Sequence, residues 1–194
     1  LIVEAKFSNG RPDIVTDDLV RAAQRGHLPA LKLLYQQHAS GVLRLVTGIL
    51  GSVEDGRDLT QEIFIKAFEK LPELQNVAAF AGWLKQLSSR MAIDQLRRKS
   101  DWAQPEILEL IEAPDDWVQA CDLLTQLDDV EELLRVLSTS ERALVWLFAV
   151  EGYRHDELAT LMATSEMAVR QRYRRAIVKL KATLINKVSH ETAR

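Results

Sequence analysis

Apolar residues recur every three or four positions along most of this 194-residue chain, which is the period of one face of an α-helix. The longest such pattern covers residues 28–50 and stops at Gly51, a residue type that commonly ends helices. The same spacing predicts further helices over residues 17–26, 52–71 and 80–98. Nearly every segment has this period, so the sequence predicts an all-α fold.

The helical pattern fails over residues 101–116, where two prolines and scattered acids interrupt it, and returns over residues 117–137. Residues 138–141 (STSE) match a capping box, which predicts the start of another helix that runs to Gly152. We therefore expect two small helical domains joined by a linker.

A helix-turn-helix is predicted after Gly152. Residues 155–162 form its first helix, and the polar turn 163–165 supplies a hydroxyl that can cap the second helix, residues 166–181. The apolar side of the second helix is expected to hold Val169, Tyr173, Ala176, Ile177, Leu180 and Leu184. Its other side is expected to hold Gln171, Arg174 and Arg175, flanked by Arg170, Arg172, Lys179 and Lys181.

Such a basic helix can lie in the DNA major groove, with its first turns on base edges and its flanking cations on phosphates. A solvated basic face on a packing helix would show the same residues, but the turn in front of it favours DNA binding.

Net charge by itself argues against a nucleic-acid partner, because it is −3 at pH 7. The charge is unevenly distributed. Residues 1–100 carry 14 basic and 11 acidic side chains, residues 101–134 carry no basic and 11 acidic ones, and residues 135–194 carry 11 basic and 6 acidic ones. Two mildly basic modules thus flank a strongly acidic segment, and a phosphate backbone responds to the local field.

Two more clusters have both a structural and a functional interpretation. One side of a predicted helix holds, at i, i+3, i+4 and i+7, the residues Asp58, Gln61, Glu62 and Ile65. This side is either a solvated face or a binding face. The basic residues at 97–99 either stabilise the C-terminal end of a helix through its dipole or contact phosphates.

The residues for catalysis or metal binding are missing. The sequence has no glycine-rich phosphate loop, no Cys/His cluster and no nucleophile elbow, and its one cysteine and four histidines are scattered. We expect a binding protein without catalytic residues, metal or cofactor. No apolar run approaches the roughly 18–20 residues that span a bilayer, and no signal peptide opens the chain. A cytoplasmic location without membrane insertion is therefore expected.

Several segments resemble the extracytoplasmic-function (group IV) bacterial sigma factors. Residues 58–68 (DLTQEIFIKAF) are similar to region 2.2 of that family, and residues 80–84 (FAGWL) with 92–98 (AIDQLRR) resemble regions 2.3 and 2.4. Residues 137–142 (LSTSER), 151–153 (EGY) and 157–175 resemble region 4. The order and spacing of these segments make the resemblance specific.

The resemblance implies a leader over residues 1–16, region 2 over 17–100, an acidic linker over 101–116 and region 4 over 117–194. It further implies an alternative sigma factor that directs core RNA polymerase to promoter DNA, under the control of an anti-sigma factor. The linker, on this basis, either mimics a phosphate chain against a basic wall of the polymerase or is a plain soluble tether.

Site residues follow from the same resemblance, position by position. The clamp helices of the largest polymerase subunit would contact Asp58, Gln61, Glu62 and Ile65. The −10 element, with one base flipped from the opened strand, would be held by Gln75, Asn76, Phe80, Arg90, Arg97, Arg98 and Lys99. The −35 duplex would be read by Ser165, Met167, Arg170, Gln171, Arg172, Arg174, Arg175 and Lys179.

Two positions depart from the family pattern. Ala163 and Met167 stand where the family often has glycine. If the turn requires a positive φ, Ala163 costs about 1 kcal/mol. Met167 makes the expected base-facing surface less polar.

Two other classes of protein fit part of the pattern. A dimeric helix-turn-helix transcriptional regulator would need a dimerisation surface, and the acidic spacer offers no heptad seam for one. A helical protein-interaction module would use the polar faces without touching DNA.

Overall fold

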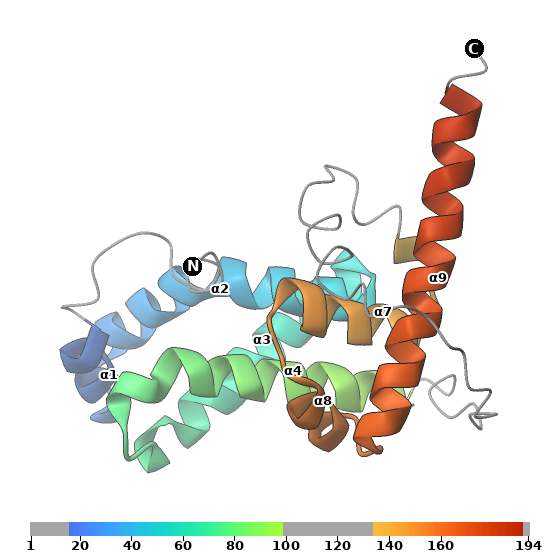
Figure 1. Cartoon of the computed structure of the whole chain (residues 1–194). Helices are drawn as coiled ribbons and strands as arrows, with labels where there is room; N and C mark the ends of the chain where they lie inside the picture. Colours follow the sequence, from blue (N-terminus) through green and yellow to red (C-terminus); the bar gives the residue numbers. More distant parts are fainter. Residues whose placement is uncertain (1–15, 99–133, 192–194) are drawn as a thin grey trace. The chain divides into compact units, whose positions relative to one another are not determined.

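The computed structural model describes residues 16–98 and 134–191, which contain helices and turns and no strand (Figure 1). The predicted all-α fold is confirmed for these ranges. The chain divides into two compact units, and the division falls between Ala92 and Ile93, inside one helix. The predicted linker over residues 101–116 and most of the predicted helix over residues 117–137 lie outside the described ranges.

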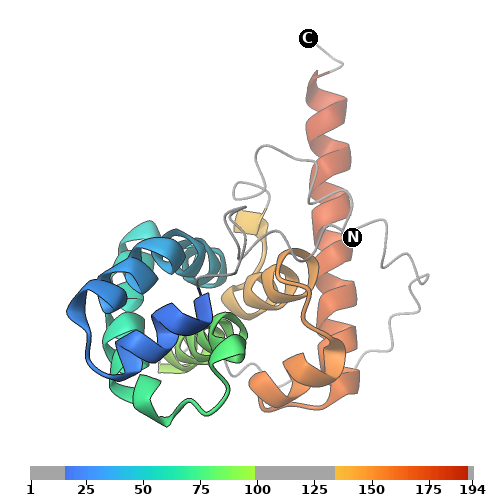
Figure 2. The same ribbon diagram turned by 90° about the vertical axis from the view of Figure 1, so that its left-hand side faces the viewer.

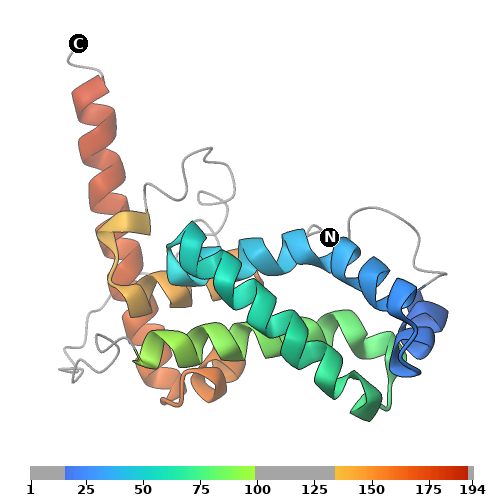
Figure 3. The same ribbon diagram turned by 180° about the vertical axis from the view of Figure 1, so that it is seen from behind.

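The first unit is built from α1 (Thr16–Gln24), α2 (Leu28–Leu50), α3 (Val53–Lys70) and the part of α4 (Phe80–Arg98) up to Ala92. Two short 3-10 turns, η3 (Leu71–Glu73) and η4 (Val77–Ala79), connect α3 to α4. Figure 3 shows α3 crossing obliquely between α2 and α4. The bounds of α2 and α4 agree with the predicted ranges.

Local signals explain the sharp corner between α2 and α3. Gly51 takes a left-handed conformation with φ 71°, and its N–H donates to the Thr47 carbonyl at 2.7 Å. Ser52 then caps α3, because its Oγ accepts the Asp55 N–H at 3.2 Å. Four residues on, a Cβ on Gly56 would lie 2.3 Å from Thr47 Oγ1, so glycine permits the close approach of the two helices.

The core of the first unit is apolar and includes an aromatic cluster. Tyr35 of α2 lies edge-on to Phe64 of α3, with ring centroids 4.8 Å apart, and Phe64 lies 5.7 Å from Phe68. The fully buried side chains include Leu34, Leu45, Ile49, Ile63, Leu71, Phe80 and Leu84.

A side chain of α1 holds the α3–α4 connection in place. Gln24 Nε2 donates to the carbonyls of Leu71 at 3.0 Å and Leu74 at 2.8 Å. Val77 is buried below the turn, and Asn76 Oδ1 accepts the Ala78 N–H at 3.2 Å. These contacts fix a short connection whose outer positions remain exposed.

The second unit contains η5 (Leu134–Val136), α7 (Thr139–Val145), a π-helical turn η6 (Trp146–Val150), α8 (His155–Leu161) and α9 (Glu166–Glu191). The structure confirms the predicted helix-turn-helix in α8 and α9. It extends the second helix ten residues past the predicted end, as one straight rod (Figures 1 and 2).

The predicted caps of this unit are confirmed as well. Ser138 Oγ accepts the Glu141 N–H at 3.3 Å while Glu141 Oε2 accepts the Ser138 N–H at 2.9 Å, which completes the capping box of α7. In the turn before α9, Ser165 Oγ accepts the Ala168 N–H at 3.1 Å.

Ala163 has the positive φ that the sequence analysis considered for this turn. Its φ is 48°, and it is the non-glycine residue with positive φ among the described residues. An L-residue pays a steric cost there that glycine avoids. The turn geometry therefore favours glycine over the residue present.

We expect Ala163→Gly to raise the free energy of unfolding of the second unit by about 0.5–1 kcal/mol, because relief of the left-handed strain exceeds the entropy that glycine adds to the unfolded chain. Urea unfolding followed by circular dichroism measures the change. Ala159→Gly, inside α8, is the matched control and should destabilise by about 1 kcal/mol. Equal destabilisation by both variants would contradict the assignment of strain to Ala163.

Candidate polymerase and nucleic-acid interfaces

An exposed strip runs along α3. The four side chains that the sequence placed there are all exposed, and the side chain of Ile65 is 61% exposed. Helical spacing brings Glu54 and Glu69 onto the same side, four residues before Asp58 and four residues after Ile65. We call this set the α3 strip: Glu54, Asp58, Gln61, Glu62, Ile65 and Glu69. The sequence analysis missed its two outer acids, although their i±4 spacing was available.

The connection before α4 presents polar side chains and hides the aromatic one. Gln75 and Asn76 are exposed. Phe80, predicted to help hold a flipped base, is fully buried, with its ring 5.3 Å from His38 and 6.0 Å from Trp83 by centroid. The prediction of a base contact for Phe80 is therefore wrong in this structure, because neighbouring rings already cover it.

The basic side chains of α4 lie on two sides of the helix. Arg90 and Arg97 are seven residues apart and share one side, where Trp83 is half-buried seven residues before Arg90. An acid interrupts this side, since Asp94 Oδ1 lies 3.5 Å from Arg97 Nη1. Arg98 is exposed about 100° further round the helix. Lys99 lies outside the described residues.

The outward side of α9 gathers Met167, Arg170, Arg174, Val178 and Lys181, which recur at helical spacing. Met167 is 65% exposed and Val178 is 49% exposed, both high values for apolar side chains. Ser165 is exposed at the start of the helix, where its Oγ serves as the cap. We call the five residues the outward face of α9; the sequence list of site residues omitted Val178 and Lys181.

Gln171 does not belong to this face. It was predicted to face outward, but it is only 6% exposed, and Ala168 next to it on the helix surface is 7% exposed. The buried side of α9 is thus wider than the apolar positions alone predict. Arg172, Arg174 and Arg175 are all half-buried, and Arg172 and Arg175 lie further round the helix than Arg174.

Lys179 is part of an ion pair inside the unit. Its Nζ donates to Glu141 Oε1 at 2.7 Å and to Oε2 at 2.9 Å. The carboxylate therefore serves both the capping box of α7 and the middle of α9. Lys179 therefore stabilises the fold of the unit, a role that the sequence analysis did not predict for it.

The pKa of Glu141 reflects the same contacts. Burial by itself would raise the pKa of this carboxyl, but the hydrogen bonds from Lys179 and from the backbone and hydroxyl of Ser138 outweigh it and hold the pKa below the ordinary value. The ionised form is therefore the one that the folded unit stabilises.

Aromatic packing fixes the rotation of α9. Tyr173 is buried, with its ring 4.7 Å from Phe148 and 6.3 Å from His155 by centroid, and Phe148 lies 4.4 Å from His155. Burial lowers the pKa of His155, and nearby Arg170 adds to that effect. A neutral imidazole is thus part of the packing between α8 and α9.

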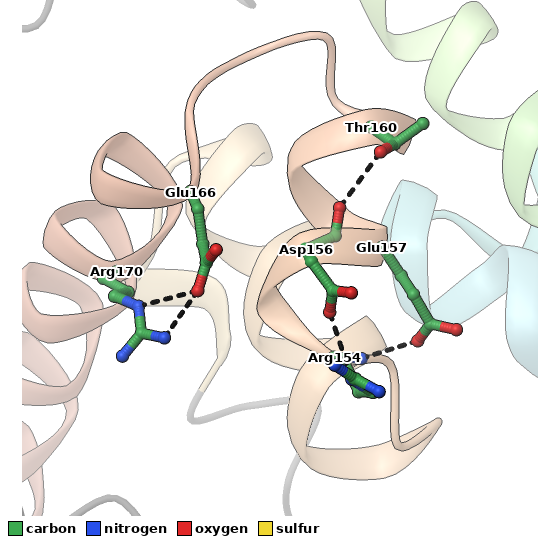
Figure 4. Close-up of polar contacts among 6 residues, drawn as sticks. All are labelled: Arg154, Asp156, Glu157, Thr160, Glu166 and Arg170. Atoms are coloured by element: carbon green, nitrogen blue, oxygen red, sulfur yellow. Dashed lines mark hydrogen bonds and ion pairs between the residues drawn. The ribbon is translucent and has the colours of Figure 1, made fainter.

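Two exposed ion pairs lie at the starts of α8 and α9 (Figure 4). In α8, Arg154 Nε lies 3.1 Å from Asp156 Oδ1, and the Arg154 N–H donates to Glu157 Oε2 at 2.8 Å. In α9, Arg170 Nε donates to Glu166 Oε1 at 3.1 Å, and Arg170 Nη2 donates to the same oxygen. Both starts therefore carry a positioned carboxylate beside an arginine.

No group of three or more His, Cys, Asp or Glu side chains in residues 16–98 and 134–191 is placed to hold a metal ion. Among the helices that the structure describes, none is long and apolar enough to cross a membrane.

Comparison with known proteins gives this arrangement a family. Residues 34–101 match the model of sigma-70 region 2, and residues 127–180 match that of sigma-70 region 4. Both models describe regions of sigma-70 proteins, and the second covers the helix-turn-helix of α8 and α9. The chain belongs to the sigma-70 family, and the relatives that it resembles include extracytoplasmic-function sigma factors.

Individual relatives agree with this assignment. The chain is 31% identical to the ECF RNA polymerase sigma factor SigE of Mycolicibacterium smegmatis over 86% of its own length and spans 65% of that protein. The solved structure of CnrH in complex with the cytosolic domain of CnrY is similar in fold, with TM-score 0.53 and 23% identity over 89% of this chain and 98% of CnrH. The sigma factor RpoE of Bartonella quintana, solved with the anti-sigma factor NepR, gives TM-score 0.51 and 17% identity over 84% and 97%.

Replacing Glu141 with Gln should lower the free energy of unfolding of the second unit by about 1–3 kcal/mol at pH 7, because the charge-assisted hydrogen bonds of Lys179 and Ser138 are weakened. The folded pKa lies below the ordinary value of 4.5, so this stabilisation is fully present above pH 4.5 and is lost as the pH falls through the folded pKa. Urea unfolding from pH 7 to pH 3 measures it.

Lys179→Met is the matched control, since it removes the ion pair and leaves the capping box. This variant should lose part of the stability of the second unit and keep part of the loss of stability at acid pH. Parallel pH profiles for the native protein and the Gln variant below pH 4.5 would show that Glu141 has no such role.

Proposed function

We propose that this chain is an alternative sigma factor, which binds core RNA polymerase and directs it to a particular set of promoters. One observation carries the proposal: a single chain contains both sigma-70 regions, and each presents an exposed helix side of its own charge. The α3 strip is acidic with an apolar centre, while the outward face of α9 is cationic.

The α3 strip is the proposed contact with the clamp helices of the largest polymerase subunit. Its centre is the exposed side chain of Ile65, and an apolar centre ringed by polar groups is typical of a protein interface. Asp58 and Glu62 supply charge for steering towards a basic partner, and Gln61 supplies hydrogen bonds.

The connection over residues 75–79 and the adjoining sides of α4 are the proposed site for the −10 element. Gln75 and Asn76 are exposed on a connection that Gln24 holds in place, so their polar groups can meet the edges of unstacked bases. Arg90 and Arg98 are exposed and would contact the backbone of the same strand, and the half-buried Trp83 would lie beside Arg90. Buried Phe80 supports this surface from below.

The outward face of α9 is the proposed reader of the −35 duplex. A recognition helix contacts bases with its N-terminal residues, where Met167, Arg170 and Arg174 lie. Arg side chains pair with guanine, and an exposed Met offers apolar contact to a thymine methyl group. The helix-turn-helix fixes the helix start at which these residues are presented.

The proposed organisation keeps region 2 over residues 17–100, the linker over 101–116 and region 4 over 117–194. We also propose that an anti-sigma factor controls the chain, which the complex of RpoE with NepR supports. Acting on the polymerase and the chromosome places the protein in the cytoplasm. Its part in transcription is to bind and direct the polymerase, which performs the chemistry.

The double variant Asp58→Ala, Gln61→Ala should reduce the affinity for core polymerase at least tenfold while the fold is retained, because both side chains are exposed and removing them leaves the core intact. Core binding is measured by fluorescence anisotropy and output by in vitro transcription. The control is Asp18→Ala, an exposed acid on α1. Unchanged transcription by the double variant would remove the α3 strip from the polymerase contact.

Arg174→Ala should weaken recognition of the native −35 sequence by about 1–3 kcal/mol, the usual value of one base contact. The measurement is holoenzyme binding to promoters that differ at single −35 positions. Arg172→Ala, further round α9, is the control and should leave the base preference intact. Equal losses on all promoters would show that Arg174 contacts phosphate only.

A further inference from the structure

The first turn of α9 contains one ion pair. It lies at the end of the helix where a recognition helix makes its first base contacts. Glu166 opens α9, and Arg170 lies one turn later. Arg170 Nε and Nη2 both donate to Glu166 Oε1, the first at 3.1 Å. The side chains are 52% and 45% exposed for Arg170 and Glu166, so the pair lies at the surface (Figure 4).

The geometry divides the donors of the guanidinium. The Nε–Nη2 edge of Arg170 is directed at Glu166, and the remaining donors, on Nη1 and the second hydrogen of Nη2, lie on the other edge of the fork. Two contacts to one oxygen restrict the orientation of the guanidinium plane of Arg170. Part of the entropy cost of ordering this side chain for a second, bidentate contact is therefore already met.

The pair also changes what the arginine attracts. A lone cation on a DNA-facing helix is drawn to any phosphate within reach, whatever the sequence. A carboxylate on the same guanidinium offsets that attraction, while the donors of the outer edge keep their geometry. An arginine held in this way is suited to the O6 and N7 atoms of guanine, which accept a bidentate contact in the major groove.

We propose that Glu166 is a positioning residue for promoter specificity: it holds Arg170 towards a guanine of the −35 element and keeps it from the phosphate backbone. The inference rests on the proposed function of α9 as the −35 reader. Glu166 acts by positioning Arg170 and needs no base contact of its own.

The test uses the full-length protein assembled with core polymerase and a promoter library randomised over the −35 element. Glu166→Ala should reduce the preference for guanine at one position about tenfold. The same variant should steepen the dependence of log K on log salt by about one phosphate contact, because the released Arg170 turns to the backbone. Thermal melting should remain within the range of surface substitutions.

The matched control is Asp156→Asn. It removes an exposed carboxylate from a second arginine pair, with Arg154, in the same helix-turn-helix. This variant changes the net charge by the same amount, so it should leave the base preference unchanged. A loss of guanine preference in the control equal to that in Glu166→Ala would overturn the proposal, because charge alone would then explain it.

A double-mutant cycle isolates the coupling. In an Arg170→Ala background, Glu166→Ala should have no further effect on base preference. Additive effects, or an unchanged preference in Glu166→Ala, would show that the pair is an ordinary surface contact. If the native holoenzyme selects no −35 sequence at all, the proposed function of α9 fails; if it selects one and Glu166→Ala selects the same one, only the positioning role fails.

Discussion

The contact of Tyr173 with Phe148 and His155 is the interaction on which the outward face of α9 depends. A helix turns by about 100° per residue, so a small rotation of α9 would carry Met167 and Arg174 away from solvent. The buried ring of Tyr173 sets that rotation on one side, and the Lys179–Glu141 pair sets it again two turns later. The DNA recognition proposed for this face would thus depend on packing on the other.

Features that depend on near neighbours in the chain could be predicted from the sequence. The caps Ser52, Ser138 and Ser165 each act on an N–H three residues away, and Gly51 closes a turn with a carbonyl four residues back. Such contacts are encoded within one helical turn, so residue order alone specifies them. For the same reason the strain at Ala163 could be anticipated from the turn type.

Features that join distant segments could not be predicted in this way. Gln24 reaches carbonyls 47 and 50 residues further along the chain, and Lys179 meets a carboxylate 38 residues before it. The burial of Gln171 and Phe80 likewise depends on which neighbours cover each side chain. A helical wheel assigns directions around one axis, but it does not contain the second helix or ring that turns a polar or aromatic position inward.

Charge bears on how the proposed reader of duplex DNA would act together with a polymerase. The segment 166–181 carries six cations, and two of them are held in ion pairs, Arg170 with Glu166 and Lys179 with Glu141, which lowers the positive charge offered to phosphates. Each phosphate contact contributes only about 0.9 to the salt slope of binding, so one short helix with few such contacts gives modest affinity at cellular salt. Linking the helix-turn-helix to a second binding region on one large partner raises its effective concentration at the promoter. On the proposed function, the ion pairs that order α9 would therefore reduce its affinity as an isolated module and make its DNA binding conditional on assembly with polymerase.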